Sequence, residues 1–152
     1  NDHNLYVACP FSFFYFVKSL NLPALLADPK FLKYKGFTVC DETNHGIQLW
    51  YLPFSTDSIK PEFMKCTKHS HIDERGYVLY YTNQCPFNAK YVPIVENLAK
   101  EHNIPFRVIH ITSKEQARNV PTPITTYALF YDGQYLTNEI MNEKKFLKLI
   151  ND

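Results

Sequence analysis

Apolar positions in the second half of the chain follow first the pattern of a buried strand and then that of a helix. Residues Tyr77–Thr82 form a continuous apolar run, which is typical of a strand covered on both faces. Pro86 suits a first helical turn, and after it apolar positions recur at helical spacing. Phe106–Ile111 is the next predicted strand. Two strands joined through a helix are expected to be parallel, with a right-handed crossover.

The remaining elements of this half are indicated by caps and turns. Ser113–Gln116 fits a capping box for a short helix. Thr125–Tyr131 is a predicted strand, and Asp132-Gly133 is a two-residue hairpin signal that returns the chain as Gln134–Thr137. Asn142 is placed to cap a last helix. The predicted order is β-α-β-α-β-β-α, with the final hairpin as an antiparallel edge.

The first half predicts a smaller unit. Asp28-Pro29 is a helix start and Gly36 is placed to end that helix. Phe37–Cys40 and Ile47–Leu52 read as strands, separated by a turn at Asn44–Gly46. Residues 53–76 are polar and irregular, and we interpret them as a linker that contains a short helix around residues 62–67.

The apolar segment Leu5–Val17 is too short to span a bilayer, and no basic residue precedes it as a signal peptide requires. We therefore expect a strand or helix that belongs to a core, and no membrane partner. Because the chain begins with Asn1 rather than Met, we expect a fragment, a processed product or a trimmed chain.

Composition excludes several classes of function. The 152 residues include only 4 glycines, so no glycine-rich loop is available to wrap a nucleotide. The net charge is +1 without a long basic run, which argues against nucleic-acid binding. The 4 cysteines contain no CxxC pair, a pattern that favours reduced thiols in a cytoplasmic protein over a disulfide framework.

Cys85 is the candidate reactive group. It lies between the predicted strand and the helix that Pro86 opens, where unpaired backbone N–H groups stabilise a thiolate. Lys90, about one turn further on, adds positive charge. The loop Pro121-Thr122-Pro123 can fold back beside Cys85, and Thr122–Pro123 is its candidate cis bond. Pro121 is the alternative, and Pro123 is preferred because the next strand follows it sooner. The second cysteine of a dithiol exchanger is absent, because position 88 is Asn88.

This element order, with Cys-Pro at the first strand-to-helix turn, resembles the thioredoxin fold in its glutaredoxin-sized form. Three segments, Tyr80–Phe87, Thr112–Ala117 and Pro121–Tyr127, are similar to the YoaP-like domain, which is found behind GNAT-family N-acetyltransferase domains. Phe31–Val39 and the strands after it resemble the closing helix and strands of a GNAT domain. The fold class expected is α/β. Residues 1–52 are expected to form a GNAT-like remnant, residues 53–76 a linker, and residues 77–152 a YoaP-like thioredoxin-fold domain.

The resemblance also implies that one part of a GNAT domain, the loop that binds acetyl-CoA, is missing from this chain. GNAT enzymes hold the acetyl-CoA pyrophosphate on an Arg/Gln-x-x-Gly-x-Gly/Ala loop, and no such motif occurs here. We therefore expect no cofactor in this chain, although a complete GNAT domain takes acetyl-CoA, and no acetyltransferase activity from this chain alone. Tyr34 is the one tyrosine comparable to the proton donor of GNAT enzymes, and packing is the preferred interpretation for it.

Three functions remain open. The preferred one is an accessory module, in which Cys85, Pro86, Phe87, Thr122 and Pro123 hold a peptide or small-molecule acceptor, or the rest of an acetyltransferase domain. The second is a monothiol, glutaredoxin-like oxidoreductase that uses Cys85 and an external thiol. The third is a structural domain in which the cysteine is only a small buried side chain.

A metal site is the weakest hypothesis. Cys66, His69 and His71 could join Cys85 as ligands, but Cys-x-x-His-x-His is a poor zinc spacing. We interpret these residues as part of a solvated linker and expect no metal. His45 and His102 need only surface or capping roles.

Overall fold

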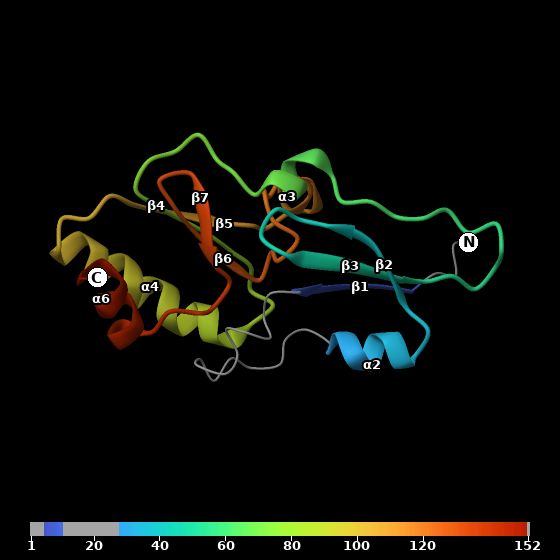
Figure 1. The fold of residues 1–152 in the computed structure, drawn as a ribbon. Helices are drawn as coiled ribbons and strands as arrows, with labels where there is room; N and C mark the ends of the chain where they lie inside the picture. Colours follow the sequence, from blue (N-terminus) through green and yellow to red (C-terminus); the bar gives the residue numbers. More distant parts are fainter. Residues whose placement is uncertain (1–4, 11–27, 152) are drawn as a thin grey trace. The chain divides into compact units, whose positions relative to one another are not determined.

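The computed structural model describes residues 5–10 and 28–151, and it shows a mixed α/β chain with two separate sheets (Figure 1). The chain divides into two compact units, residues 1–69 and residues 70–152. Each unit is built on its own sheet, so each is considered by itself. None of the helices in the described part of the chain is long and apolar enough to cross a bilayer.

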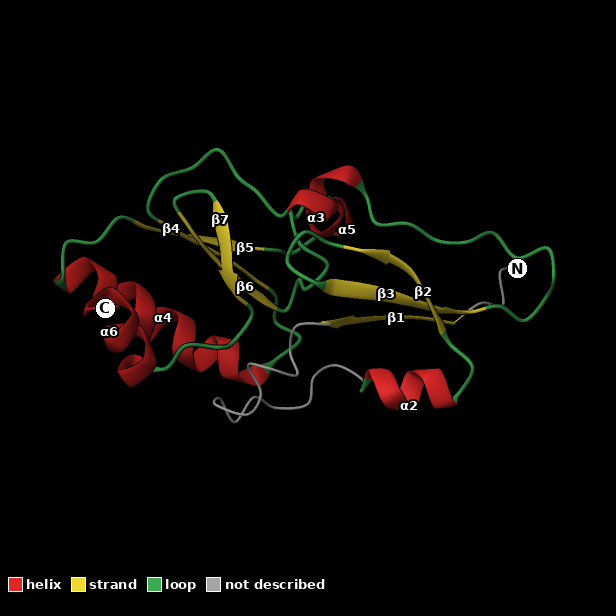
Figure 2. Cartoon of the chain, in the orientation of Figure 1, coloured by secondary structure: helices red, strands yellow, loops and turns green. Residues whose placement is uncertain are grey.

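The first unit is built on an antiparallel sheet in the order β1-β3-β2 (Figure 2). Its strands are β1 (Leu5–Pro10), β2 (Thr38–Glu42) and β3 (Ile47–Leu52). Helix α2 (Pro29–Tyr34) precedes β2, and the Asp28 side chain caps it by accepting a hydrogen bond from the Lys30 N–H, as predicted. Among the described residues of this unit, Leu32, Phe37 and Trp50 pack into one buried cluster.

The expected linker, residues 53–76, is divided between the two units. Its first part, through His69, belongs to the first unit and ends in the short helix α3 (Lys65–His69). The expected core segment Leu5–Val17 supplies β1 over residues 5–10, and its residues 11–17 lie outside the described part of the chain.

The second unit is built on a mixed sheet in the order β5-β4-β6-β7. Strands β4 (Tyr77–Tyr81) and β5 (Phe106–His110) are parallel, as predicted. Strand β6 (Tyr127–Tyr131) is antiparallel to β4, and β7 (Gln134–Thr137) forms the predicted antiparallel edge. Asp132 and Gly133 both have positive φ, 45° and 83°, as a two-residue hairpin turn requires.

Three helices complete this unit: α4 (Pro86–Glu101), α5 (Lys114–Arg118) and α6 (Glu143–Asn151). Helices α4 and α6 pack beside each other (Figure 1). The core includes buried residues from both helices and from one face of the sheet, among them Tyr77, Leu79, Val95, Tyr127 and Phe146. A smaller cluster on the opposite face contains Val78, Ala128 and Phe130. The sheet is therefore buried on both faces, as the apolar run Tyr77–Thr82 predicts.

Two expectations are wrong. Tyr34 was expected to pack, but 82% of it is exposed, because it lies on the outer side of a six-residue helix that buries only Leu32. The Thr122–Pro123 peptide bond was expected to be cis, but every peptide bond in the described residues is trans. The loop before β6 therefore reaches the sheet with trans peptide bonds at both of its prolines.

Candidate functional site

Cys85 lies where the sequence places it, at the start of α4. It is the N-cap residue, with extended backbone angles, and Pro86 is the first residue of the helix. The thiol is half-buried and makes no capping hydrogen bond. Pro86 and Phe87 are exposed in the first turn, and the ring of Phe87 stacks on Tyr91 with a centroid separation of 6.3 Å.

Asn88 occupies the position of the missing second cysteine, and it is fully buried. Its Nδ2 donates hydrogen bonds to the backbone oxygen of Thr82 at 2.9 Å and to that of Thr126 at 2.7 Å. Because both partners are carbonyl oxygens, the amide nitrogen must face them. The side chain thus joins the first turn of α4 to the end of β4 and to the residue before β6. We call this pair of hydrogen bonds the Asn88 bridge.

The loop that contains Pro123 reaches the Cys85 region through Thr126 rather than through the proline. The Thr126 hydroxyl donates to Gln84 Oε1 at 3.2 Å, and its carbonyl accepts from the Thr82 N–H at 3.2 Å. Thr122 is only 2% exposed, and its hydroxyl accepts from the Ile124 N–H within the loop. Pro123 is half-buried. The two predicted halves of the site are therefore neighbours, but the Thr122 side chain is turned inward.

An open pocket of about 530 Å³ has the Thr82–Gln84 loop as one of its walls. It is lined by residues 82–84, residues 110–114, Ala117 and Thr125. The first two segments follow the carboxyl ends of the parallel strands β4 and β5, which is where ligands bind in open α/β sheets. We call this the β4–β5 pocket. None of the five predicted site residues lines it.

Most of the residues that line the β4–β5 pocket carry polar side chains, and none of them is acidic. His110 lies at the end of β5, and its ring stacks on Tyr81 at 4.5 Å with an interplanar angle of 9°. The capping box of α5 orders the opposite wall: Ser113 Oγ accepts from the Gln116 N–H, and Gln116 Oε1 accepts from the Ser113 N–H. The pocket is thus preformed by hydrogen bonds of its own loops.

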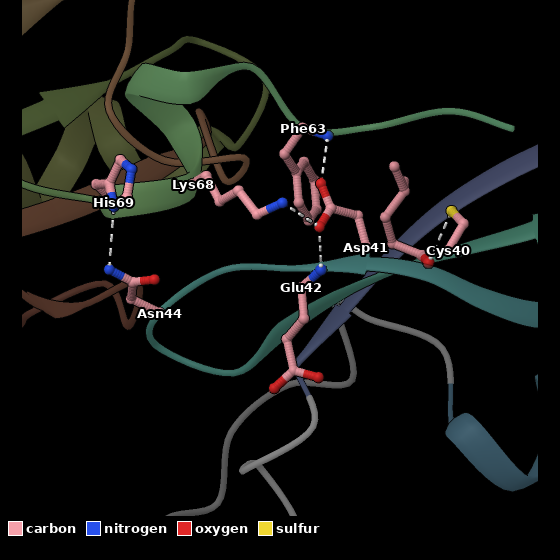
Figure 3. Close-up of polar contacts among 8 residues, drawn as sticks. Cys40, Asp41, Glu42, Asn44, Phe63, Lys68 and His69 are labelled. Carbon is pink, nitrogen blue, oxygen red and sulfur yellow. Dashed lines mark hydrogen bonds and ion pairs between the residues drawn. The ribbon is translucent and has the colours of Figure 1, made fainter.

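A separate group of polar contacts in the first unit surrounds Asp41 (Figure 3). The carboxylate is 9% exposed, lies 2.7 Å from Lys68 Nζ and accepts hydrogen bonds from the N–H groups of Phe63 and Glu42, both at 2.9 Å. Burial acts to raise the pKa of Asp41, but the hydrogen bonds from Lys68 and the two N–H groups outweigh it and lower that pKa. These contacts fasten residues 63–68 to β2, and they give the expected linker a structural role.

The thiols and histidines do not form a metal site in the part of the chain that the structure describes. Cys40, Cys66 and Cys85 form no disulfide there, and no group of three His, Cys, Asp or Glu side chains is arranged to hold an ion. Cys40 Sγ donates to the Leu49 carbonyl oxygen at 3.1 Å, and burial raises the pKa of this thiol. His69 lies 3.3 Å from Asn44, and His71 contacts Gln134 and Asp73.

Sequence reasoning missed the residues that line the pocket. His110, Ser113 and Lys114 were assigned only to a strand and a cap. The signal that points to them was present, since the predicted parallel pairing brings Thr82–Gln84 and His110–Lys114 to one edge of the sheet. Cys85 directly follows this loop in the sequence but does not line the pocket.

Comparison with known proteins supports the resemblance that the sequence carries. Residues 105–148 match the YoaP-like family model. The chain is 36% identical over 126 residues to the uncharacterized N-acetyltransferase YoaP of Bacillus subtilis (strain 168), an alignment that covers 83% of this chain and 50% of that protein. The chain thus spans about half the length of the curated relative it matches, and no solved structure matches it. The chain is a relative of YoaP, and its residues 105–148 belong to the YoaP-like family, as the sequence predicted.

Proposed function

We propose that this chain is the accessory region of an N-acetyltransferase and that its second unit binds a peptide or small-molecule acceptor in the β4–β5 pocket. The observation that carries the proposal is the pocket itself, about 530 Å³ at the carboxyl ends of two parallel strands. This volume is of the ordinary size for a small ligand or a few peptide residues. The similarity to YoaP supports the acetyltransferase context.

We infer further that the second unit has a thioredoxin-like fold. The supporting observations are the element order from β4 to α6, the parallel β4–β5 pair and the antiparallel β6–β7 edge. The helix that follows the first strand begins at a Cys-Pro pair. In this proposal the start of α4, at Cys85, supports the fold through the Asn88 bridge. The β4–β5 pocket binds the peptide or small-molecule acceptor.

The first unit is proposed to be the closing portion of a GNAT domain. Helix α2, the two strands after it and the turn between them supply the elements that the resemblance requires. Because the sequence has no Arg/Gln-x-x-Gly-x-Gly/Ala loop, this chain is proposed not to bind acetyl-CoA. Saturable binding of acetyl-CoA to the chain, measured by calorimetry, contradicts this part of the proposal.

The pocket proposal is tested by narrowing the pocket without removing a polar group. Ala117 lines the pocket on α5, and Ala117→Leu fills part of it. The matched control is Ala89→Leu, at an exposed position of α4. A library of blocked tripeptides is screened against the chain by ligand-detected NMR, and the chemical shifts of the chain locate each binder.

The expected result is that binders shift the amide signals of residues 82–84 and 110–114, that Ala117→Leu removes this binding, and that Ala89→Leu retains it. Binders that perturb only other surfaces, or that bind Ala117→Leu as well as the parent chain, contradict the proposed function. A Cys85→Ser chain is expected to bind as the parent does, whereas a thiol-based function predicts a loss.

A further inference from the structure

The β4–β5 pocket presents hydrogen-bond donors and positive charge with nothing to neutralise them. Lys114 and His110 line it, together with the side-chain amides of Asn83 and Gln84. Among the residues that the structure describes, Lys114 makes no ion pair and the His110 ring nitrogens have no hydrogen-bond partner, its ring contact being the stack on Tyr81. No carboxylate lines the pocket. The lining is therefore matched to a ligand that accepts hydrogen bonds and carries negative charge.

Gln84 adds a donor whose direction is set by the fold. Its Oε1 accepts from the Thr126 hydroxyl at 3.2 Å, so its Nε2 is held on the opposite side of the amide group. Within the described part of the chain, no acceptor forms a hydrogen bond with the Gln84 Nε2 group. An amide donor fixed in this way loses little rotamer freedom when it binds a ligand.

The chemistry of the pocket favours a carboxylate over a phosphate. Phosphate sites in proteins usually combine several free backbone N–H groups or arginine forks. Here the N–H groups of Thr112 and Ser113 already donate to Gln116 Oε1, at 2.7 and 3.2 Å, and no arginine lines the pocket. One lysine and a few neutral donors suit a single negative charge spread over two oxygens.

We propose that the β4–β5 pocket recognises a carboxylate group of its ligand, with Lys114 as the counter-ion and Gln84 and His110 as hydrogen-bond donors. The inference rests on the proposed function and adds the ligand class: an acceptor or partner peptide that carries a free carboxylate. Glu115, the neighbour of Lys114, is not among the residues that line the pocket.

The probes are two pairs that differ only in the charged group. Succinate and succinamide form the small-molecule pair, and a blocked glycine–glutamate–glycine peptide and its glutamine counterpart form the peptide pair. Each is titrated into the 152-residue chain while amide and side-chain NH₂ signals are followed by NMR. The variant is Lys114→Gln, and the control is Lys144→Gln, an exposed lysine on α6 outside the pocket.

We expect a carboxylate probe to shift the Gln84 side-chain signal and the amides of residues 110–114 saturably, and its neutral counterpart to bind more weakly. Lys114→Gln is expected to weaken carboxylate binding roughly two- to fivefold, the range for a solvent-exposed ion pair, and Lys144→Gln to leave it unchanged. Which pair binds better distinguishes a small-molecule source from a peptide source.

Three results overturn the inference. They are the absence of saturable carboxylate binding, equal binding of charged and neutral probes, and equal affinity in Lys114→Gln and the parent chain. If neutral peptides bind in the pocket as well as acidic ones, the ligand class is wrong and the proposed function stands. If no library member or probe perturbs the pocket, the proposed function fails with it.

Discussion

Replacement of Asn88 by alanine tests whether the Asn88 bridge holds the second unit together. Asn88 is fully buried, and its two hydrogen bonds of 2.9 and 2.7 Å have the ordinary geometry of strong amide–carbonyl pairs. The change leaves the carbonyl oxygens of Thr82 and Thr126 without this donor, at a position where the Asn88 side chain is fully buried. We therefore expect a large loss of stability that is confined to the second unit.

The magnitude follows from the two bonds. Each bond contributes about 1 kcal/mol net, and a carbonyl left buried without a partner adds a desolvation cost of roughly 1–3 kcal/mol. The Thr126 carbonyl is half-buried and keeps the hydrogen bond from the Thr82 N–H, so this second cost falls mainly on the buried Thr82 carbonyl. Alanine recovers at most about 0.7 kcal/mol of helix propensity. The expected loss is about 2–4 kcal/mol.

The assay is native-state amide hydrogen exchange by NMR, read at the most protected amides of β4 and β6, which report the second unit alone. The matched control is Asn97→Ala, an exposed asparagine on the same helix, because it carries the same gain in propensity without buried bonds. If Asn88→Ala lowers the opening free energy by no more than Asn97→Ala does, the bridge is not a principal support and the reasoning is refuted.

Three further predictions concern other parts of the chain. Asp41→Asn is expected to cost about 1–3 kcal/mol of unfolding free energy at neutral pH. Because folding lowers the pKa of Asp41, this stabilisation is present above the ordinary pKa of 3.8 and is lost as the pH falls from there through the folded pKa. Urea titrations of parent and variant, followed by the fluorescence of Trp50, the single tryptophan, should therefore give the same stability at acid pH. Gly133→Ala places a Cβ 2.6 Å from the Ile72 carbonyl oxygen at φ 83°, and a loss of at least about 2 kcal/mol is expected in the same exchange assay. Phe146→Ala removes a fully buried ring and is expected to cost about 3–5 kcal/mol in that assay, whereas Phe87→Ala, at an exposed position, should cost little.

Much of the secondary structure was predictable because its signals are local. Asp28 and Ser113 cap their helices through contacts within three residues, and the Asp132-Gly133 turn needs only its own backbone angles. The division between units was less predictable. Residues 63–68 look like a polar linker, but the Asp41 carboxylate holds them to a strand more than twenty positions earlier. No local pattern records a partner at that distance.

In the candidate site, too, the features that depend on local sequence were predictable and those that depend on distant residues were not. The N-cap position of Cys85 follows from the Cys-Pro pair after a strand, so the sequence predicts it. The inward orientation of Thr122 and the trans bond before Pro123 depend on how the loop meets the sheet at Thr126, which involves contacts with Thr82, Gln84 and Asn88. These contacts join residues about forty positions apart, and propensity carries no information about them.

Asn88 changes how the missing cysteine is interpreted. From the sequence, asparagine at this position reads as the loss of a resolving thiol, which leaves a weakened redox site. In the structure the side chain uses both amide hydrogens to join α4, β4 and the segment before β6, which a thiol with one weak donor cannot do. A cysteine there would break the bridge that orders the Thr82–Gln84 loop. That loop is also one wall of the β4–β5 pocket, so the residue that stands in place of a second cysteine also orders a wall of the proposed binding site.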